Sequence, residues 1–288
     1  MGADFQQGSV TLQDGVAMAY RDYGPRDAGT ETVLCLPGLT RNARDFHGIA
    51  SVMSETRRVI APDLRGRGLS DWAASYKSYT VAQETQDVLQ LLAALGLNEV
   101  VFVGTSRGGL ITMNMAAQRP TVIKAAILND IGPKVGLKGL IRIFGYVGRT
   151  KAPATWADAV AAMRKINEAS FPGLSDSEWE DFAHNLIEEK DGKLELMYDP
   201  AIGKATRRFT GMRDIPGAWT LFAAMSAIPT LVIRGELSDI LEAKTVDKMK
   251  AQKPDLEVCT VPDRGHAPML TESAAQSAIL SFLQTIDG

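Results

Sequence analysis

The chain has 288 residues, of which 45% are hydrophobic and 23% are charged, with a formal net charge of −3. This is the composition of an ordinary globular protein with enough chain to bury a large core. The charge balance excludes a strongly basic protein and gives no reason to expect a nucleic acid or an anionic membrane as a partner.

The first residues, Met1-Gly2-Ala3-Asp4-Phe5-Gln6, lack the charged segment and the apolar run of a secretory signal. No apolar run anywhere in the sequence approaches the length needed to span a bilayer. We therefore expect a cytoplasmic protein that does not enter a membrane.

Strands and helices begin to alternate early in the chain. Residues 9–12 and 16–20 read as two strands joined by the Asp14-Gly15 turn. Residues 32–36 form a short apolar strand that leads into Pro37-Gly38-Leu39-Thr40, and helical spacing follows over residues 43–54. Residues 58–61 form another apolar strand, which ends in a polar, glycine-rich loop at residues 62–71. Apolar positions at helical spacing then mark residues 79–95.

The centre of the pattern is Gly104-Thr105-Ser106-Arg107-Gly108. The apolar, β-branched run at residues 100–103 precedes it, and helical periodicity follows. Gly-x-Ser-x-Gly between a strand and a helix is the arrangement of a nucleophile elbow, in which a sharp turn lifts the serine hydroxyl clear of the sheet. Glycine suits positions 104 and 108, since side chains there would collide with the neighbouring helix and strand. The alternative is a glycine-rich turn with an idle serine.

The second half interrupts the alternation and then resumes it. Residues 125–128 form a strand, whereas residues 134–224 are dominated by helical stretches with no convincing buried strand. Residues 229–235 and 256–261 are strands, and a final helix covers residues 272–286. Short apolar strands that alternate with amphipathic helices predict an α/β protein with a mostly parallel sheet covered on both faces.

The two cysteines, Cys35 and Cys259, lie in apolar runs and are expected to be buried thiols. No cysteine and histidine cluster has the spacing of metal ligands. We expect no disulfide framework, no metal and no cofactor.

Taken together, these motifs resemble the α/β-hydrolase fold family along nearly the whole chain. The resemblance is carried by the Pro37-Gly38-Leu39 loop, the loop at residues 63–70, the elbow at Ser106, Gly235-Glu236-Leu237-Ser238-Asp239 and Gly265-His266, in that order. One departure is Pro37-Gly38, where many family members have His-Gly. The resemblance implies a mostly parallel sheet of about eight strands with an inserted helical cap. The core domain would comprise residues 1–133 and 225–288, and the cap residues 134–224.

The resemblance also implies a catalytic triad in the family order Ser106, Asp239 and His266. A serine hydroxyl needs a neighbouring base, and His266 lies in a loop between a strand and the last helix. The other histidines, His47 and His184, are expected to be solvated or packed, with His184 as a possible pocket residue. For the carboxylate that holds the imidazole, Asp239 is the predicted residue, with Asp130 and Glu236 as alternatives.

The tetrahedral intermediate of acyl transfer needs preorganised hydrogen-bond donors. The backbone N–H groups of Leu39 and Arg107 are predicted to form this oxyanion hole. Arg41 and Asn42 lie beside the same loop and are interpreted as an exposed helix start capped by Asn42, with contact to a substrate carboxylate as the alternative.

The predicted activity is a serine hydrolase that cleaves a small or medium carboxylic ester through an acyl-enzyme on Ser106. The alternatives within the same fold are a C–C bond hydrolase, a lactonase, an acyltransferase, or a small-ligand receptor without turnover. Trp156, Trp179 and Trp219 either line an apolar pocket or pack the cap helices. The sequence does not indicate an oligomeric state.

Overall fold

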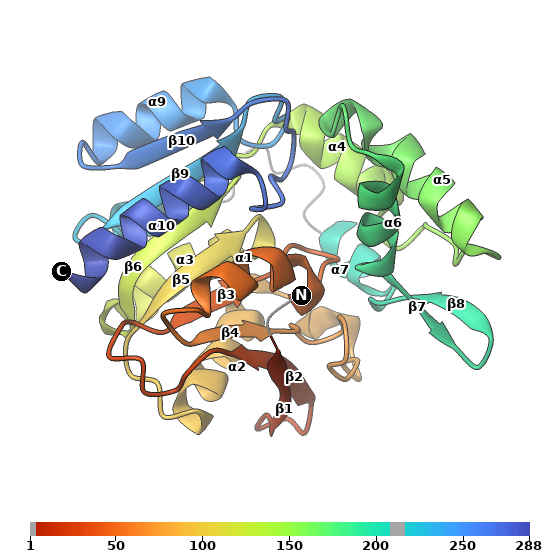
Figure 1. The fold of residues 1–288 in the computed structure, drawn as a ribbon, viewed down its shortest axis with the longest axis horizontal. Coiled ribbons are helices and arrows are strands. Elements are labelled where there is room, and N and C mark those ends of the chain that lie inside the picture. Colours follow the sequence, from red (N-terminus) through yellow and green to blue (C-terminus); the bar gives the residue numbers. More distant parts are fainter. Residues whose placement is uncertain (1–3, 208–216) are drawn as a thin grey trace.

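Eight strands form one sheet in the computed structural model, which describes residues 4–207 and 217–288 (Figure 1). Only the β1–β2 and β2–β4 pairs are antiparallel, so the predicted mostly parallel sheet is confirmed. The strands, in their order across the sheet, are β1 (Phe5–Thr11), β2 (Ala17–Tyr23), β4 (Val59–Pro62), β3 (Val33–Leu36), β5 (Val100–Thr105), β6 (Ile123–Asn129), β9 (Thr230–Gly235) and β10 (Glu257–Val261).

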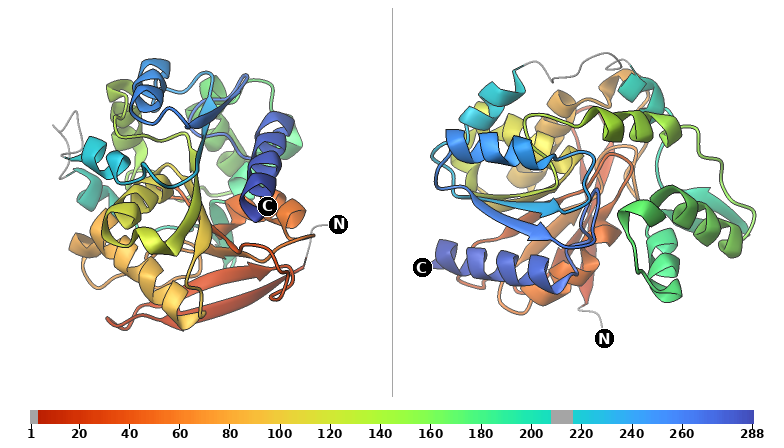
Figure 2. Two further views of the ribbon diagram at one scale, coloured as in Figure 1. Left: turned by 90° about the vertical axis from the view of Figure 1, so that its left-hand side faces the viewer. Right: turned by 90° about the horizontal axis from the view of Figure 1, so that it is seen from above.

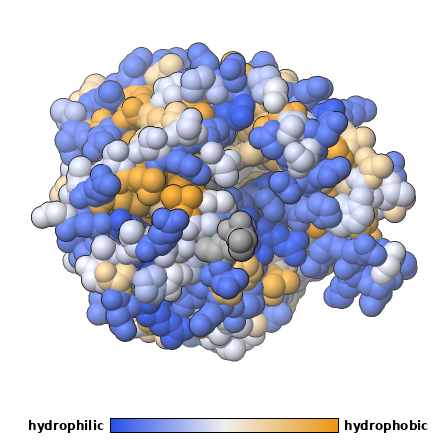
Figure 3. Space-filling view, in the orientation of Figure 1, coloured by the Kyte–Doolittle hydropathy of each residue, from blue (hydrophilic) through white to orange (hydrophobic). Residues whose placement is uncertain are grey.

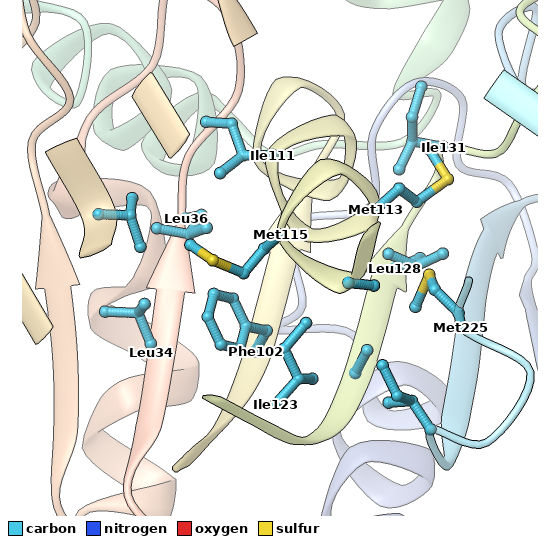
Figure 4. Close-up of a cluster of buried hydrophobic side chains, with 14 of the residues drawn as sticks. Leu34, Leu36, Phe102, Ile111, Met113, Met115, Ile123, Leu128, Ile131 and Met225 are labelled. Carbon is cyan, nitrogen blue, oxygen red and sulfur yellow. The ribbon is translucent and has the colours of Figure 1, made fainter. Parts of the chain in front are cut away.

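Helices cover both faces of this sheet, as Figure 2 shows from two sides. Residues of α1 (His47–Met53) and α10 (Ser273–Asp287) pack in the apolar cluster on one face. The other cluster includes residues of α2 (Val81–Ala94), α3 (Arg107–Gln118), α8 (Ala218–Ala223) and α9 (Ala243–Gln252). Figure 4 shows part of this second cluster, where Met115 of α3 lies beside Leu36 and Phe102 of the sheet.

Local sequence explains where these helices begin. The Thr80 side chain accepts a hydrogen bond from Gln83 N at the start of α2, which is the cap expected of threonine. Asn42 caps the short 3₁₀ helix at Ala43–Phe46 in the same way, through Arg44 N. The predicted capping role of Asn42 is therefore confirmed, but its predicted exposure is wrong, because Asn42 is buried and its Nδ2 donates to Asn185 O.

The segment between β6 and β9, residues 130–229, is called the inserted segment here. Its described elements are α4 (Leu137–Tyr146), α5 (Trp156–Asn167), α6 (Asp176–His184), the hairpin β7 (Ile187–Lys190) and β8 (Lys193–Leu196), α7 (Ile202–Arg207) and α8. The hairpin was not expected from the sequence, because its charged, half-exposed strands lack the apolar pattern of a buried strand. The lobe formed by α5, α6 and the hairpin is mostly hydrophilic on the face seen in Figure 3.

The division into a core domain and a cap, with boundaries at residues 133 and 225, stays a prediction. Among the described residues, no helix combines the length and apolar character required to cross a membrane.

Candidate active site

Ser106 lies in the sharp turn between β5 and α3, at the carboxyl edge of the parallel strands. Its backbone has φ 50° and ψ −107°, a conformation that residues other than glycine adopt rarely. A Cβ on Gly104 would come within 2.6 Å of the Gly108 backbone, and one on Gly108 within 2.1 Å of the Leu36 carbonyl oxygen. The two glycines therefore permit the close approach of strand and helix that produces the turn.

His266 and Asp130 complete a hydrogen-bonded chain that begins at Ser106. The Nε2 atom of His266 lies 2.8 Å from Ser106 Oγ, and its Nδ1 atom lies 2.8 Å from Asp130 Oδ2. Asp130 is fully buried, and the His266 side chain is 9% exposed. These two hydrogen bonds connect a hydroxyl, an imidazole and a carboxylate in the order that activates a serine.

Asp130 is held by the loop that follows β9. Its Oδ1 accepts a hydrogen bond from Gly235 N at 2.9 Å, and its Oδ2 accepts one from Ser238 Oγ at 2.5 Å. Ser238 Oγ in turn accepts bonds from Ile240 N and Leu241 N. Asp130 itself has φ 53°, a left-handed conformation that aspartate tolerates better than most residues.

The prediction of Asp239 as the partner of His266 is wrong. Asp239 instead binds the guanidinium of Arg142 in a bidentate pair, at 2.8 and 2.6 Å. The pair forms because α4 packs on the loop after β9, with Gly136 N bonded to Ile240 O and Gly139 N to Asp239 O. Burial favours a raised pKa for Asp239, but the bonds from Arg142 outweigh it and hold the pKa of the carboxyl below 3.8.

Glu236, the second alternative, also has a hydrogen-bond partner other than His266. Its Oε2 accepts a hydrogen bond from Asp263 N at 3.3 Å. The carboxylate that contacts His266 is therefore the one that follows β6, the strand next to β9 in the sheet.

The backbone N–H groups of Leu39 and Arg107 lie near the serine and are free to donate. Arg107 is the first residue of α3, where an amide has no partner within the helix. Neither amide donates a hydrogen bond to another described residue. The loop before Leu39 lies against the serine, since a Cβ on Gly38 would be 3.8 Å from Ser106 Cβ.

Arg67 contacts Leu39 directly, which was not foreseen from the sequence. Its Nε donates to Leu39 O at 2.9 Å, and its Nη1 donates to Glu84 Oε1 at 2.8 Å. Arg67 and Glu84 are both fully buried. Local spacing in the sequence does not indicate this contact, because it depends on the approach of α2.

A cavity of about 490 Å³ opens above Ser106 and His266. The sheet side contributes the loop from Gly38 to Gly48 and residues 266–271, and the inserted segment contributes the opposite wall. Aromatic residues on the cavity wall were not singled out from the sequence: Phe46, Tyr146, Phe171, Phe182 and Tyr198. Burial raises the pKa of the Tyr146 hydroxyl.

None of the three tryptophans of the inserted segment lies among the residues that line this cavity. Trp179 is buried, and Trp219 packs against the apolar cluster on one face of the sheet. Trp156 stacks on His184, with ring centroids 3.8 Å apart. His184 lines the cavity, and so does His47, whose Nδ1 lies 3.3 Å from the Tyr23 hydroxyl. Of the two interpretations, packing therefore describes the tryptophans.

The described part of the chain contains no group of three or more histidine, cysteine, aspartate or glutamate side chains arranged to bind a metal ion. Cys35 is a buried free thiol and Cys259 a half-buried one. Burial raises the pKa of both thiols, which favours the protonated form over the reactive thiolate.

Comparison with known proteins shows which family and which individual proteins are similar to this chain. A family model described as the alpha/beta hydrolase fold matches residues 31–273. A 3-hydroxybutyrate-oligomer hydrolase of Cupriavidus necator is 35% identical over 263 residues, which is 89% of each chain. A 2-(acetamidomethylene)succinate hydrolase of Mesorhizobium japonicum is 25% identical over 81% of each chain. The crystal structure of a hydrolase from Novosphingobium aromaticivorans, 40% identical, has a TM-score of 0.92 and covers 98% of this chain and 99% of that one.

Proposed function

This chain belongs to the α/β-hydrolase family, and we propose that it is a serine hydrolase that cleaves carboxylic esters through an acyl-enzyme on Ser106. The observation that carries the proposal is the continuous hydrogen-bonded chain from Ser106 through His266 to Asp130, with 2.8 Å at each step. A serine hydroxyl becomes a useful nucleophile when a positioned base takes its proton as it attacks.

The reaction follows from this arrangement. Ser106 Oγ attacks the ester carbonyl while His266 Nε2 takes its proton, and His266 then protonates the departing alcohol. Water activated by the same nitrogen removes the acyl group and restores the serine. Asp130 binds Nδ1–H, which fixes the tautomer and stabilises the imidazolium that forms.

The Leu39 and Arg107 amides are the proposed oxyanion donors, because both are free and flank the serine. Donors that point in advance at the developing negative charge stabilise the tetrahedral intermediate without reorganising. These are backbone roles, so the side chains at positions 39 and 107 contribute only indirectly.

For the substrate, we propose a small or medium ester of a hydroxy acid. The relative from Cupriavidus necator is named for 3-hydroxybutyrate oligomers, in which successive hydroxy acids are joined by ester bonds. A cavity of about 490 Å³, lined by both aromatic and charged side chains, has room for a few such units.

The test is hydrolysis of p-nitrophenyl butyrate by the wild type, Ser106→Ala and Ser226→Ala, with folding checked by circular dichroism. Ser226 is exposed and distant in sequence from the triad, which makes its variant a matched control. We expect turnover in the wild type and the control, and a loss of at least about a thousand-fold in Ser106→Ala. Equal turnover in all three proteins would overturn the proposal.

A further inference from the structure

Three arginines line the cavity above Ser106: Arg44, which donates a hydrogen bond to His184 O, and Arg41 and Arg142, which come from separate parts of the chain. Arg41 follows the Gly38–Leu39 loop after β3, and Arg142 lies on α4 of the inserted segment. Their side chains are 20% and 24% exposed, so each guanidinium is largely enclosed yet accessible from the cavity.

Both guanidinium groups are fixed in the same manner. Arg41 uses Nε and Nη2 to bind Asp45, at 2.5 Å each, and Arg142 uses Nε and Nη2 to bind Asp239. The Arg41 guanidinium also lies 4.5 Å from the centre of the Phe182 ring. In both arginines Nη1 has no hydrogen-bond partner among the described residues, so each presents a preoriented, unused donor.

The two arginines approach the reacting groups from different sides. A Cβ on Gly38 would lie 3.2 Å from Arg41 Cγ and 3.8 Å from Ser106 Cβ, so the Arg41 stem flanks the nucleophile. Arg142 lies close enough to Asp130 for their charges to interact. Asp239 likewise lies close enough to His266 for a charge interaction. The charges of both arginines act on Tyr146, which lies one turn after Arg142 on α4.

Tyr146 adds a third donor to this group. Tyr146 lines the cavity, and its hydroxyl has no hydrogen-bond partner in the part of the chain that the structure describes. Two other carboxylates on the cavity wall, Glu178 and Asp181, are exposed residues of α6, where solvent screens their repulsion of an anion.

We propose that Arg41, Arg142 and Tyr146 form an anion subsite that binds a carboxylate of the ester substrate. This inference rests on the proposed function and narrows its substrate class to esters that carry a free carboxylate. A short linear oligomer of a hydroxy acid is such a compound, since one end keeps its carboxylate a few bonds from the last ester oxygen. Guanidinium and phenol N–H and O–H groups are suitable donors for that end.

The experiment compares two substrates that differ only in charge: the linear dimer of 3-hydroxybutyrate as the free acid, and the primary amide of the same dimer. Each has one ester bond, and its cleavage is measured by chromatography as the loss of the dimer. The proteins are the wild type, Arg41→Gln, Arg142→Gln and Arg164→Gln. Arg164 is the control, because it pairs with Asp176 on the inserted segment without lining the cavity.

We expect the wild type to cleave the free acid with the higher kcat/KM. Arg41→Gln and Arg142→Gln should each lower kcat/KM for the free acid by about 10-fold to 100-fold, the usual loss for a hydrogen bond to a charged group. For the neutral amide each should change it by less than about 3-fold, and Arg164→Gln should leave both substrates unchanged. Arg142→Lys keeps the cation and should recover part of the loss, which separates charge recognition from misfolding.

Equal cleavage of acid and amide by the wild type would overturn the subsite while leaving the esterase proposal intact. A parallel fall for both substrates in the arginine variants would also overturn it, since that result indicates a structural role. If the wild type cleaves neither dimer nor p-nitrophenyl butyrate, the proposed function fails and this inference fails with it.

Discussion

Arg67 and Arg107 share one buried carboxylate, with Arg67 Nη1 bonded to Glu84 Oε1 at 2.8 Å and Arg107 Nε to Glu84 Oε2 at 2.6 Å. Arg67 also donates to Leu39 O. Glu84 thus links the two loops whose amides are the proposed oxyanion donors. Burial favours a raised pKa for Glu84, but the two guanidinium groups outweigh it and lower the pKa, which keeps the group ionised.

Replacement of Glu84 by Gln should therefore affect both catalysis and stability. Because the donors are displaced rather than removed, we expect kcat for p-nitrophenyl butyrate to fall by about 10-fold, with little change in KM. The buried guanidinium groups lose their counter-charge, so the free energy of unfolding in urea should fall by about 3 kcal/mol. Glu99→Gln, at an exposed position 3.9 Å from Lys124, is the matched control. Unchanged kcat in a folded Glu84→Gln protein would contradict the linking role.

Asp130→Asn should lower kcat by about a thousand-fold or more, because an amide at this position favours the wrong tautomer of His266. Asp239→Asn should retain kcat within about 10-fold, since Asp239 contacts Arg142 and not the imidazole. The two variants are compared by steady-state kinetics on p-nitrophenyl butyrate. The opposite ranking would restore Asp239 as the acid.

Ser238→Ala removes the side-chain donor to Asp130 Oδ2 and leaves the hydrogen bond from Gly235 N to Asp130 Oδ1 in place. We expect kcat to fall by about 10-fold, the size expected for one hydrogen bond to a charged group. Ser238→Thr keeps a hydroxyl and should recover most of the activity. Equal losses in both variants would indicate that packing, rather than the hydroxyl, matters at this position.

The Arg142–Asp239 pair should make the free energy of unfolding depend on pH in the acidic range. The pKa of Asp239 is lowered in the folded chain, so the pair stabilises the fold above pH 3.8, and this contribution disappears as the pH falls through the native pKa. In urea unfolding at about pH 7, Asp239→Asn should be less stable than the wild type by about 1 kcal/mol. The difference should shrink as the pH falls to about 3. A constant difference across this range would contradict the assignment.

The elbow and the histidine were predictable because their signals are local. Ser106 lies in a strand–turn–helix pattern, and its two flanking glycines are needed because a Cβ at either position would clash. Only three histidines in the sequence compete for the role of base. The sheet was predictable for a related reason: short apolar strands separated by amphipathic helices leave few alternatives to parallel pairing.

The choice between Asp130 and Asp239 depends on contacts that local sequence does not contain. The two residues follow β6 and β9, which are neighbours in the sheet, so both reach the same edge. What separates them is the Ser238 hydroxyl on one and the guanidinium of Arg142, 97 positions away, on the other. The Gly235–Asp239 motif does lie beside the proposed catalytic histidine, as the sequence indicated. It supplies the hydrogen bonds that hold the Asp130 carboxylate rather than the carboxylate itself.

The inserted segment has an apolar cluster of its own, formed by Ala159, Met163, Ala183, Leu186, Ile187 and Leu194, which shares no residue with the two clusters on the sheet. The part of the cavity wall that α5 and α6 contribute is therefore packed separately from the sheet that carries Ser106, whereas α4 packs against the sheet through Ile143. Substitutions in that cluster can reshape the space offered to a substrate while the reacting atoms keep their spacing. Such an arrangement lets descendants of one ancestral chain diverge in what they accept without having to reinvent how they cleave it.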